Sequence, residues 1–454
     1  MKNVDEISIS SIHEMIKNKE ISIVELVQEY LKRIALVDQG PNGLNSILEI
    51  NPDVLFIAKE LDARRTEYTS KLYGVPILLK DNLDTADRMH TSAGSLALSE
   101  SFASADSDIA KNLRIKGAVL LGKTNMTEFA NHMTKGMKAG YSSRGGEVRS
   151  PYNKNKSPSG SSTGSAVAVS ANLCAASIGT DTSGSIISPA VTNGIVGFRP
   201  SIGALSQKGI IPVSFTMDAA GPMTRTVMDS AILFSELTHT FIEMNEGSLK
   251  GTVIGINQSS LQNMTHEEEK KARTVIENLK KAGAILKKVT IPQIPRKELK
   301  QIQLYEFKYS LNKYLSNLPS SFRICSLKDI IAFNDLHPNQ TLKYGQTLLI
   351  DAEENTRGDL SEITYKQLLQ RREKTKKEMV KLLQGLDICI MFEQNLILQY
   401  VGLPIITIPQ GLYNNGMPKG IYLTALNDAI LLKRAYQVEQ LIGRRVPPKI
   451  AFTE

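Results

Sequence analysis

Apolar positions near the start of the chain recur at the spacing of an amphipathic helix. Ser22 and Glu25 have the spacing of a capping box, which marks a helix N-terminus, and Ser11 and Glu14 repeat it. These patterns predict two helices within residues 11–38. The apolar stripe of the second helix consists of Ile23, Leu26, Val27, Leu31 and Ile34.

Short uninterrupted apolar runs between helical segments predict buried strands. Residues 74–79 follow a Tyr-Gly turn, and residues 118–121 follow a predicted helix at 108–116; a further helix is expected at 52–64. The alternation of helix and strand favours an α/β fold. Residues 140–165, rich in Gly, Ser, Asn and Pro, predict a loop, and the small apolar residues 165–173 after it predict a tightly packed buried helix.

Composition divides the chain into four parts, without a linker or repeat between them. An N-terminal helical part spans about 1–65, a motif-rich core about 66–235, a more helical and charged region about 240–385, and a strand-like return about 386–454. The third part holds a capping box at Thr265 and Glu268 and a Lys-rich helical pattern. We therefore predict a single intertwined domain over residues 1–454.

Overall composition is that of a soluble globular protein, with 41% hydrophobic and 22% charged residues. No apolar signal core opens the chain and no 18-residue apolar window occurs, so a cytoplasmic protein without a membrane segment is expected. The net charge of +8 suggests nucleic-acid binding as one hypothesis. However, no basic stripe of the sequence carries the interleaved aromatic residues that such binding would use. The dense basic stretch 270–288 instead fits the solvent face of an amphipathic helix, and no nucleic-acid partner is expected.

Metal and disulfide chemistry find no support in the sequence. The three cysteines have neither metal-ligand spacing nor an even number, and the six histidines form no metal motif. We expect no metal and no cofactor.

Two serines and a lysine are the candidate catalytic groups, because these residue types alone can supply nucleophile, proton relay and base. Ser185 lies in GTDTSGSIISPA (179–190), where small residues allow a sharp turn that aims successive backbone N–H groups at one point. The turn predicts an oxyanion hole, with a plain Gly/Ser turn as the alternative. Its donors would be the backbone N–H groups of Thr182, Ser183, Gly184 and Ser185.

Ser161 and Lys80 are candidates for relay and base. A hydroxyl such as that of Ser161 accepts one proton and donates another. Lys80 ends an apolar stretch, and burial there would lower its pKa toward that of a useful base; the alternative is an exposed lysine paired with Asp81. Ser161 could equally lie in a flexible Gly/Ser linker. Ser162 also fits a G-x-S-x-G nucleophile elbow, but residues 152–159 do not resemble the strand that this motif needs.

Combined, these segments resemble the amidase signature family. The resemblance covers about residues 20–235, with a weaker match at 400–440. It implies a large mixed twisted sheet flanked by many helices, with Lys80 as general base, Ser185 as nucleophile and Ser161 following a cis peptide bond. The matching motifs are GVPILLKDN (74–82), TSAGS (91–95), LLGKTNMTEFAN (120–131), SPSGSSTGSAVAV (157–169), GTDTSGSIISPA (179–190), NGIVGFRP (193–200) and DAAGPMTRTVMD (218–229).

Departures from the family pattern point to one branch. Ser183 stands where the family has glycine and Ile187 where it has arginine, so we expect Asp181 to lack an arginine partner. The pattern looks most like peptide amidases, which release ammonia from C-terminal carboxamides of peptides and amino acids. Ala130 and Asn131 are candidates for the substrate pocket, with Tyr141 and residues 387–402.

Two other functions stay open. The first is the glutamine-hydrolysing A-type subunit of a tRNA-dependent amidotransferase, and the second is a non-catalytic binding scaffold. The expected partner is a small-molecule or peptide amide substrate, and the sequence does not determine the oligomeric state.

Overall fold

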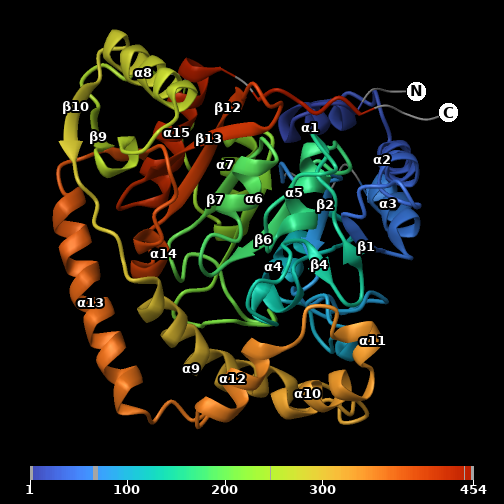
Figure 1. Cartoon of the computed structure of the whole chain (residues 1–454). Coiled ribbons are helices and arrows are strands. Elements are labelled where there is room, and N and C mark those ends of the chain that lie inside the picture. Colours follow the sequence, from blue (N-terminus) through green and yellow to red (C-terminus); the bar gives the residue numbers. More distant parts are fainter. Residues whose placement is uncertain (1–3, 65–69, 246, 444, 451–454) are drawn as a thin grey trace.

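An eleven-stranded mixed sheet runs through the molecule (Figure 1). The computed structural model describes residues 4–64, 70–245, 247–443 and 445–450. Strands from all parts of the chain join this sheet, in the order β1-β3-β2-β6-β8-β7-β12-β13-β11-β9-β10. The strands are β1 (Ile47–Ile50), β2 (Pro76–Lys80), β3 (Val119–Thr124), β6 (Ala176–Asp181), β7 (Val196–Arg199), β8 (Ala219–Thr224), β9 (Val253–Asn257), β10 (Ile285–Val289), β11 (Ile388–Met391), β12 (Ile405–Leu412) and β13 (Pro418–Thr424), and a separate hairpin pairs β4 (Tyr141–Ser142) with β5 (Gly146–Glu147).

The strand directions bring two candidate segments to one edge of the sheet. β2 pairs in parallel with both β3 and β6, whereas β8 runs antiparallel to β6. Lys80 is the last residue of β2 and Asp181 the last of β6. The carboxyl ends of parallel strands meet at the same edge, so the turn after β6 emerges beside Lys80.

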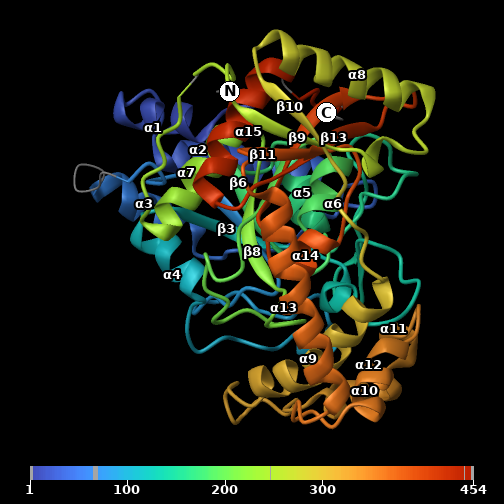
Figure 2. The ribbon, with the colours of Figure 1, turned by 90° about the vertical axis from the view of Figure 1, so that its left-hand side faces the viewer.

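Helices cover both faces of the sheet. Figure 2 shows α4 and α7 on one side and α5 and α6 on the other. The helices are α1 (Ile9–Lys17), α2 (Ile23–Val37), α3 (Val54–Arg64), α4 (Asp108–Ile115), α5 (Thr163–Ser170), α6 (Ile187–Thr192), α7 (Val227–Thr238), α8 (His266–Lys281), α9 (Arg296–Leu315), α10 (Leu327–Leu336), α11 (Pro338–Thr341), α12 (Thr347–Asn355), α13 (Ile363–Leu383), α14 (Ile397–Val401) and α15 (Asp428–Ile442).

Helix α5 is buried on every side, which explains its small residues. All eight of its residues are buried, and it packs against β2, β3, β6 and β8. A Cβ on Gly164 would lie 2.2 Å from the Ser46 carbonyl oxygen, so only glycine permits this close approach. The N-terminus of α5 therefore lies close to the sheet edge that carries Lys80.

A second hydrophobic cluster lies apart from the main core. It joins α9, α10 and α12 to the loops around Phe129 and Ile211, with Phe307 fully buried inside it. These helices gather at the end of the molecule opposite α8 (Figures 1 and 2). They pack against loops near the sheet edge at which β2 and β6 end.

Most predicted elements are confirmed, with three corrections. The second capping box is present at Ser22, but the first helix is capped by Ser8, so the Ser11 prediction is wrong. The basic stretch 270–288 is not one helix: α8 ends at Lys281, and β10 follows at the sheet edge. The predicted loop 140–165 contains the β4–β5 hairpin and the first residues of α5.

Candidate active site

Lys80 lies fully buried among hydroxyl groups at the end of β2. Its Nζ is 2.8 Å from Ser161 Oγ, 3.0 Å from Ser162 Oγ and 2.8 Å from Thr180 Oγ1. Burial lowers the pKa of Lys80 to about 7, against the opposing attraction of the carboxylates of Asp181 and Asp218. The structure therefore places Lys80 in the buried setting that the sequence predicted, rather than in an exposed pair with Asp81.

The three hydroxyl groups around Lys80 Nζ can divide its hydrogen-bonding capacity between them. A neutral lysine has two N–H donors and one lone pair, and the oxygens of Ser162 and Thr180 can accept both N–H groups. The lone pair then faces Ser161 Oγ. Ser162 itself donates to the Thr180 carbonyl and accepts from the Thr180 N–H, which commits its hydroxyl to the fold.

The backbone fixes Ser161 at the start of α5. The Gly160–Ser161 peptide bond is cis, as the resemblance implied, and the Ser161 carbonyl accepts the Thr127 N–H at 3.1 Å. The side chain is 1% exposed, so Ser161 does not lie in a flexible linker.

Ser185 lies in a tight turn that one carboxylate holds together. Asp181 accepts the backbone N–H groups of Gly184 at 2.8 Å, Ile186 at 2.8 Å and Ile187 at 3.3 Å. The Ser185 carbonyl accepts the Ser162 N–H at 3.1 Å, which ties the turn to the start of α5. Ser185 is 9% exposed, and among the described residues no hydrogen bond joins its hydroxyl to that of Ser161.

The predicted oxyanion donors need one correction. Because the Gly184 N–H already donates to Asp181, it is not free to bind an oxyanion. In the described part of the chain, the N–H groups of Thr182, Ser183 and Ser185 have no such acceptor. Three of the four predicted donors therefore remain candidates.

Asp181 has an arginine partner, contrary to the expectation from the sequence. Arg199, the last residue of β7, places its Nε 3.4 Å from Asp181 Oδ1, and neither side chain is exposed. Arg199 also donates to the carbonyls of Leu403 and Met217. Ile187 does not leave the carboxylate unpaired, because an arginine from another strand reaches it.

Asp218 supports the same turn through hydrogen bonds. Its carboxylate accepts the Thr182 hydroxyl at 2.6 Å and the N–H groups of Val213 and Ser214. Burial raises its pKa to about 6. Asp218 therefore serves as a structural hydrogen-bond acceptor for this turn and for the segment before it.

The predicted pocket residues lie in an unusual stretch of backbone. Phe129, Ala130 and Asn131 all have positive φ, at 45°, 52° and 71°. Ala130 is half-buried against the second hydrophobic cluster and Asn131 is exposed. Neither has a hydrogen bond to Lys80, Ser161 or Ser185 within the described residues, so their substrate role stays a prediction.

The 387–402 segment does reach the turn, through a residue that the sequence did not single out. A Cβ on Gly184 would lie 1.9 Å from Gln394 Nε2, so the Gln394 amide fills the space beside the turn. Its Oε1 accepts the Ser188 hydroxyl at 2.6 Å.

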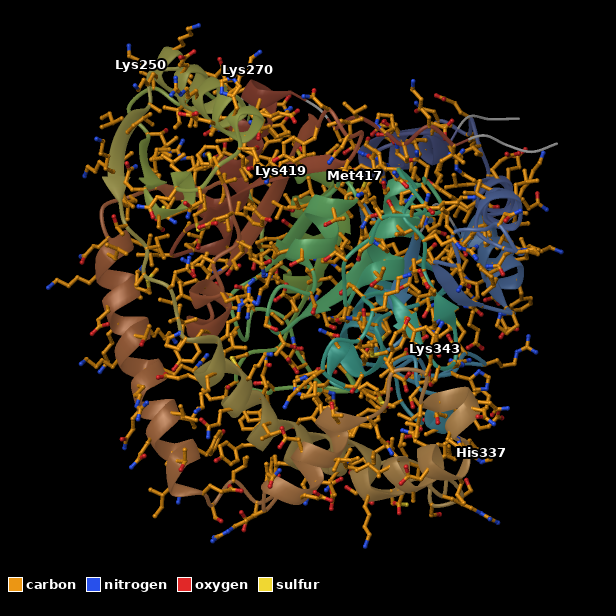
Figure 3. The ribbon with its side chains drawn as sticks, in the orientation of Figure 1. Lys250, Lys270, His337, Lys343, Met417 and Lys419 are labelled. Carbon is orange, nitrogen blue, oxygen red and sulfur yellow. The ribbon has the colours of Figure 1, made fainter. Side chains whose placement is uncertain are left out.

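We also searched the rest of the described chain for charged patches, metal ligands and membrane-spanning helices. Of the lysines labelled in Figure 3, Lys250, Lys270 and Lys419 lie toward the end of the molecule that carries α8, and Lys343 lies near α11. In the described ranges no cluster of three His, Cys, Asp or Glu side chains could hold a metal. None of the helices described there is both long and apolar enough to cross a membrane.

Comparisons with known proteins find relatives that span almost the whole chain. The family model described as Amidase matches residues 25–392. A probable amidase of Arabidopsis thaliana is 34% identical over 98% of this chain and 92% of its own length. The solved peptide amidase of Stenotrophomonas maltophilia superposes with a TM-score of 0.89 and 34% identity, over 98% of this chain and 99% of that one.

A relative with a different named function is also similar over its whole length. The A-type subunit of the glutamyl-tRNA(Gln) amidotransferase of Rhizobium etli is 29% identical over 99% of this chain and 100% of its own. The family model covers most of the chain, and the fold and motif order agree with it. The chain belongs to the amidase family of amide-hydrolysing enzymes.

Proposed function

We propose that this enzyme hydrolyses C-terminal carboxamides of peptides or amino acids to a carboxylate and ammonia. The observation that carries the proposal is the buried contact between Lys80 Nζ and Ser161 Oγ at 2.8 Å. The lowered pKa of Lys80, about 7, makes an unprotonated amine available near neutral pH.

The proposed first half-reaction forms an acyl-enzyme. Neutral Lys80 accepts the Ser161 proton, Ser161 accepts that of Ser185, and Ser185 Oγ attacks the amide carbon. The backbone N–H groups of residues 182, 183 and 185 donate to the oxyanion. The proton returns through Ser161 to the leaving nitrogen as the C–N bond breaks, and ammonia departs.

Water completes the cycle in the second half-reaction. It gives a proton to the same relay and attacks the Ser185 ester, and the C–O bond to Ser185 then breaks as the proton returns to its oxygen. The carboxylate product leaves and Ser185 is regenerated. Both half-reactions use the same three side chains and need no further proton donor.

The substrate class is proposed from two features. The chain aligns end to end with a solved peptide amidase, and Ser183 and Ile187 depart from the common family pattern in the manner that resembles that branch. Similarity to the A-type subunit of an amidotransferase over the full length favours glutamine as the second candidate substrate. A non-catalytic scaffold is disfavoured, because a structural role does not require Lys80 to be desolvated beside Ser161.

The test is ammonia release from peptide C-terminal amides, free amino acid amides, aliphatic amides and glutamine, with the Ser185→Ala protein as control. We expect rapid release from peptide amides by the wild-type enzyme and at least a roughly thousandfold loss in the variant. Release from glutamine alone would replace this proposal with the amidotransferase function.

A further inference from the structure

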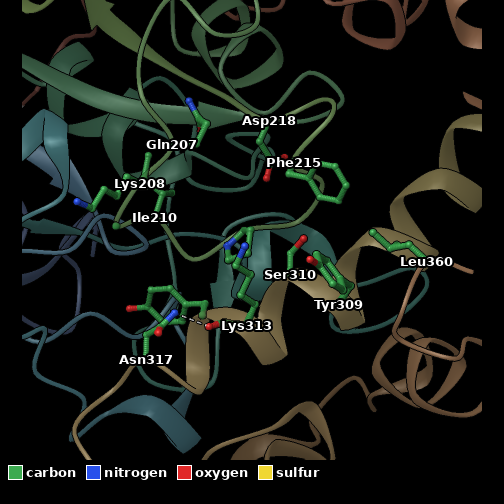
Figure 4. A pocket seen from close by; sticks show the side chains of 13 residues that line it. Gln207, Lys208, Ile210, Phe215, Asp218, Tyr309, Ser310, Lys313, Asn317 and Leu360 are labelled. Carbon is green, nitrogen blue, oxygen red and sulfur yellow. Dashed lines mark hydrogen bonds between the residues drawn. The ribbon is translucent and has the colours of Figure 1, made fainter.

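A cavity of about 560 Å³ lies beside the proposed site, within the size range of small-molecule pockets. One wall is the segment that contains Ile210, Pro212 and Phe215, and the other is the second half of α9 with Tyr309 and Lys313 (Figure 4). The lining contains none of Lys80, Ser161 and Ser185, but hydrogen bonds connect its first wall to the segments that carry Lys80 and Ser185.

Hydrogen bonds join the first wall to both catalytic segments. Asn82, two residues after Lys80, exchanges two hydrogen bonds with the backbone of Ile211, at 2.8 and 3.2 Å. Asp218, which lines the cavity, accepts the hydroxyl of Thr182 in the nucleophile turn. A molecule in this cavity is therefore one side chain away from the turn that carries Ser185.

The second wall is fixed to the first, so the cavity is preformed. Glu306 on α9 is fully buried and accepts hydrogen bonds from Ser214 and Thr216 of the first wall, and from Tyr365 of α13 at 2.7 Å. Tyr314 of α9 donates to Asp84 at 2.7 Å. A preformed cavity binds its ligand with a smaller ordering cost.

The lining combines apolar walls with an unpaired positive rim. Phe215 is 45% exposed, and its ring lies 6.1 Å from that of Tyr309. Lys208 and Lys313 are exposed, and within the described residues no carboxylate forms an ion pair with either ammonium group.

The nearby carboxyl groups are already engaged. Asp218 and Asp84 both accept hydrogen bonds, and burial raises the pKa of each to about 6. The hydroxyl of Ser310, a buried residue of the lining, has no partner in the described part of the chain. The cavity thus offers a hydroxyl donor and two cations to a ligand, while hydrogen-bond donors of the protein already satisfy the two buried carboxylates beside it.

We propose that this cavity binds the acyl side of the substrate and selects peptide amides that carry an acidic side chain next to an apolar one. The apolar residue contacts Phe215 and Tyr309, and the acidic group lies between Lys208 and Lys313 at the rim. This inference rests on the proposed amide hydrolysis and adds a substrate preference to it.

The test uses three matched peptides at low ionic strength, N-acetyl-X-Leu-NH₂ with X as Glu, Gln or Lys, and measures kcat/KM for ammonia release. Exposed charge pairs contribute modestly to binding and are screened by salt. We therefore expect kcat/KM to be about three- to tenfold higher for the Glu peptide than for the Gln peptide, and lower for the Lys peptide than for the Gln peptide. The preference should shrink at high salt.

Variants of the rim lysines identify the cause. Lys313→Gln and Lys208→Gln should each bring the Glu-to-Gln ratio of kcat/KM toward one by lowering the value for the Glu peptide, and Lys313→Glu should favour the Lys peptide. Lys250→Gln, an exposed lysine at the opposite end beside α8, should leave the ratio unchanged (Figure 3).

Two results would overturn the inference in different ways. Equal rates on all three peptides, or a ratio that survives in the rim variants, would remove the substrate preference and leave amide hydrolysis intact. Failure of the wild-type enzyme to release ammonia from any peptide amide would remove the proposed function and this inference with it.

Discussion

Lys80 would be a protonated ammonium at neutral pH in water, where its ordinary pKa is 10.5. Burial under α5 disfavours that charge, and the neighbouring hydroxyls accept hydrogen bonds from the neutral amine as well as from the cation. The two carboxylates that attract the cation are occupied elsewhere, Asp181 by backbone N–H groups and Asp218 by Thr182. The result is a buried amine with a pKa of about 7, which can act as the proposed base near neutral pH.

The pH dependence of the reaction follows from this pKa. Only the neutral amine accepts a proton, so kcat/KM for a substrate without ionisable groups, such as N-acetyl-leucinamide, should rise with pH and level off above about 7. Rate measurements from about pH 5 to 9 check this. A profile that is flat across that range, or that falls as pH rises through neutrality, would contradict the role of Lys80.

At the scale of single residues, the sequence predicted the candidate catalytic residues but not the side chains that hold them in place. Ser161, Ser185 and Lys80 lie in motifs, whereas Thr180 is an ordinary strand residue whose hydroxyl matters only because β6 lies beside β2. Ser162 fits a nucleophile motif and is in fact hydrogen-bonded to Thr180. Such partners depend on strand pairing, which a single sequence does not show.

Among the elements, the turn between β6 and α6 is held in place by contacts from several segments. Gly184 has φ of +107°, and its missing side chain makes room for Gln394 from the segment between β11 and α14. The turn is therefore defined by contacts from both halves of the chain. The sequence predicted a Gly/Ser turn here and four backbone donors, but not that Asp181 takes one of them.

Replacing Gly184 with alanine tests this element. The backbone conformation costs an L-residue about 1–3 kcal/mol, and the new Cβ would also displace Gln394. We expect Gly184→Ala to lower kcat by about a hundredfold or more, because a small displacement of the nucleophile has that effect, and to lower the melting temperature.

The matched control for this variant is Gly203→Ala. Gly203 also has positive φ, at +84°, but no atom lies within 4 Å of its Cβ position. The Gly203→Ala variant should have a lower melting temperature than the wild type but the same kcat. Near-normal turnover in Gly184→Ala would show that the geometry of the turn does not limit the reaction.

For the whole molecule, the sheet is what brings the candidate residues together. Lys80 and Ser161 are 81 residues apart in sequence and meet because β2 and β6 are parallel neighbours with α5 between them in the chain. Arg199 extends the connection, since it contacts Asp181, Met217 and Leu403 from three separate segments.

Removing this arginine should weaken the entire fold. In Arg199→Met the Asp181 carboxylate stays buried without its counter-charge, and such losses cost about 3–5 kcal/mol. Chemical denaturation should show this decrease in the free energy of unfolding. Arg371→Met, which breaks the exposed pair with Glu298, should unfold like the wild type; equal effects of the two variants would refute the role of Arg199.

The α/β class and most helices followed from periodicity, because long amphipathic segments carry a strong local signal. Strand order did not, and neither did the Asp181–Arg199 pair, since both depend on which distant strands become neighbours. The second hydrophobic cluster and the cavity beside it were equally invisible in sequence, because α9 meets residues 207–218 only in the folded chain.

Trapping the acyl-enzyme is the decisive measurement for the proposed mechanism. A slowly deacylating peptide amide would be mixed with the enzyme, quenched in acid, digested and analysed by mass spectrometry. We predict an added acyl mass on the peptide that contains Ser185, absent in Ser185→Ala and strongly reduced in Lys80→Ala. An adduct on Ser161 or Ser162, or ammonia release that persists in Ser185→Ala, would contradict the mechanism.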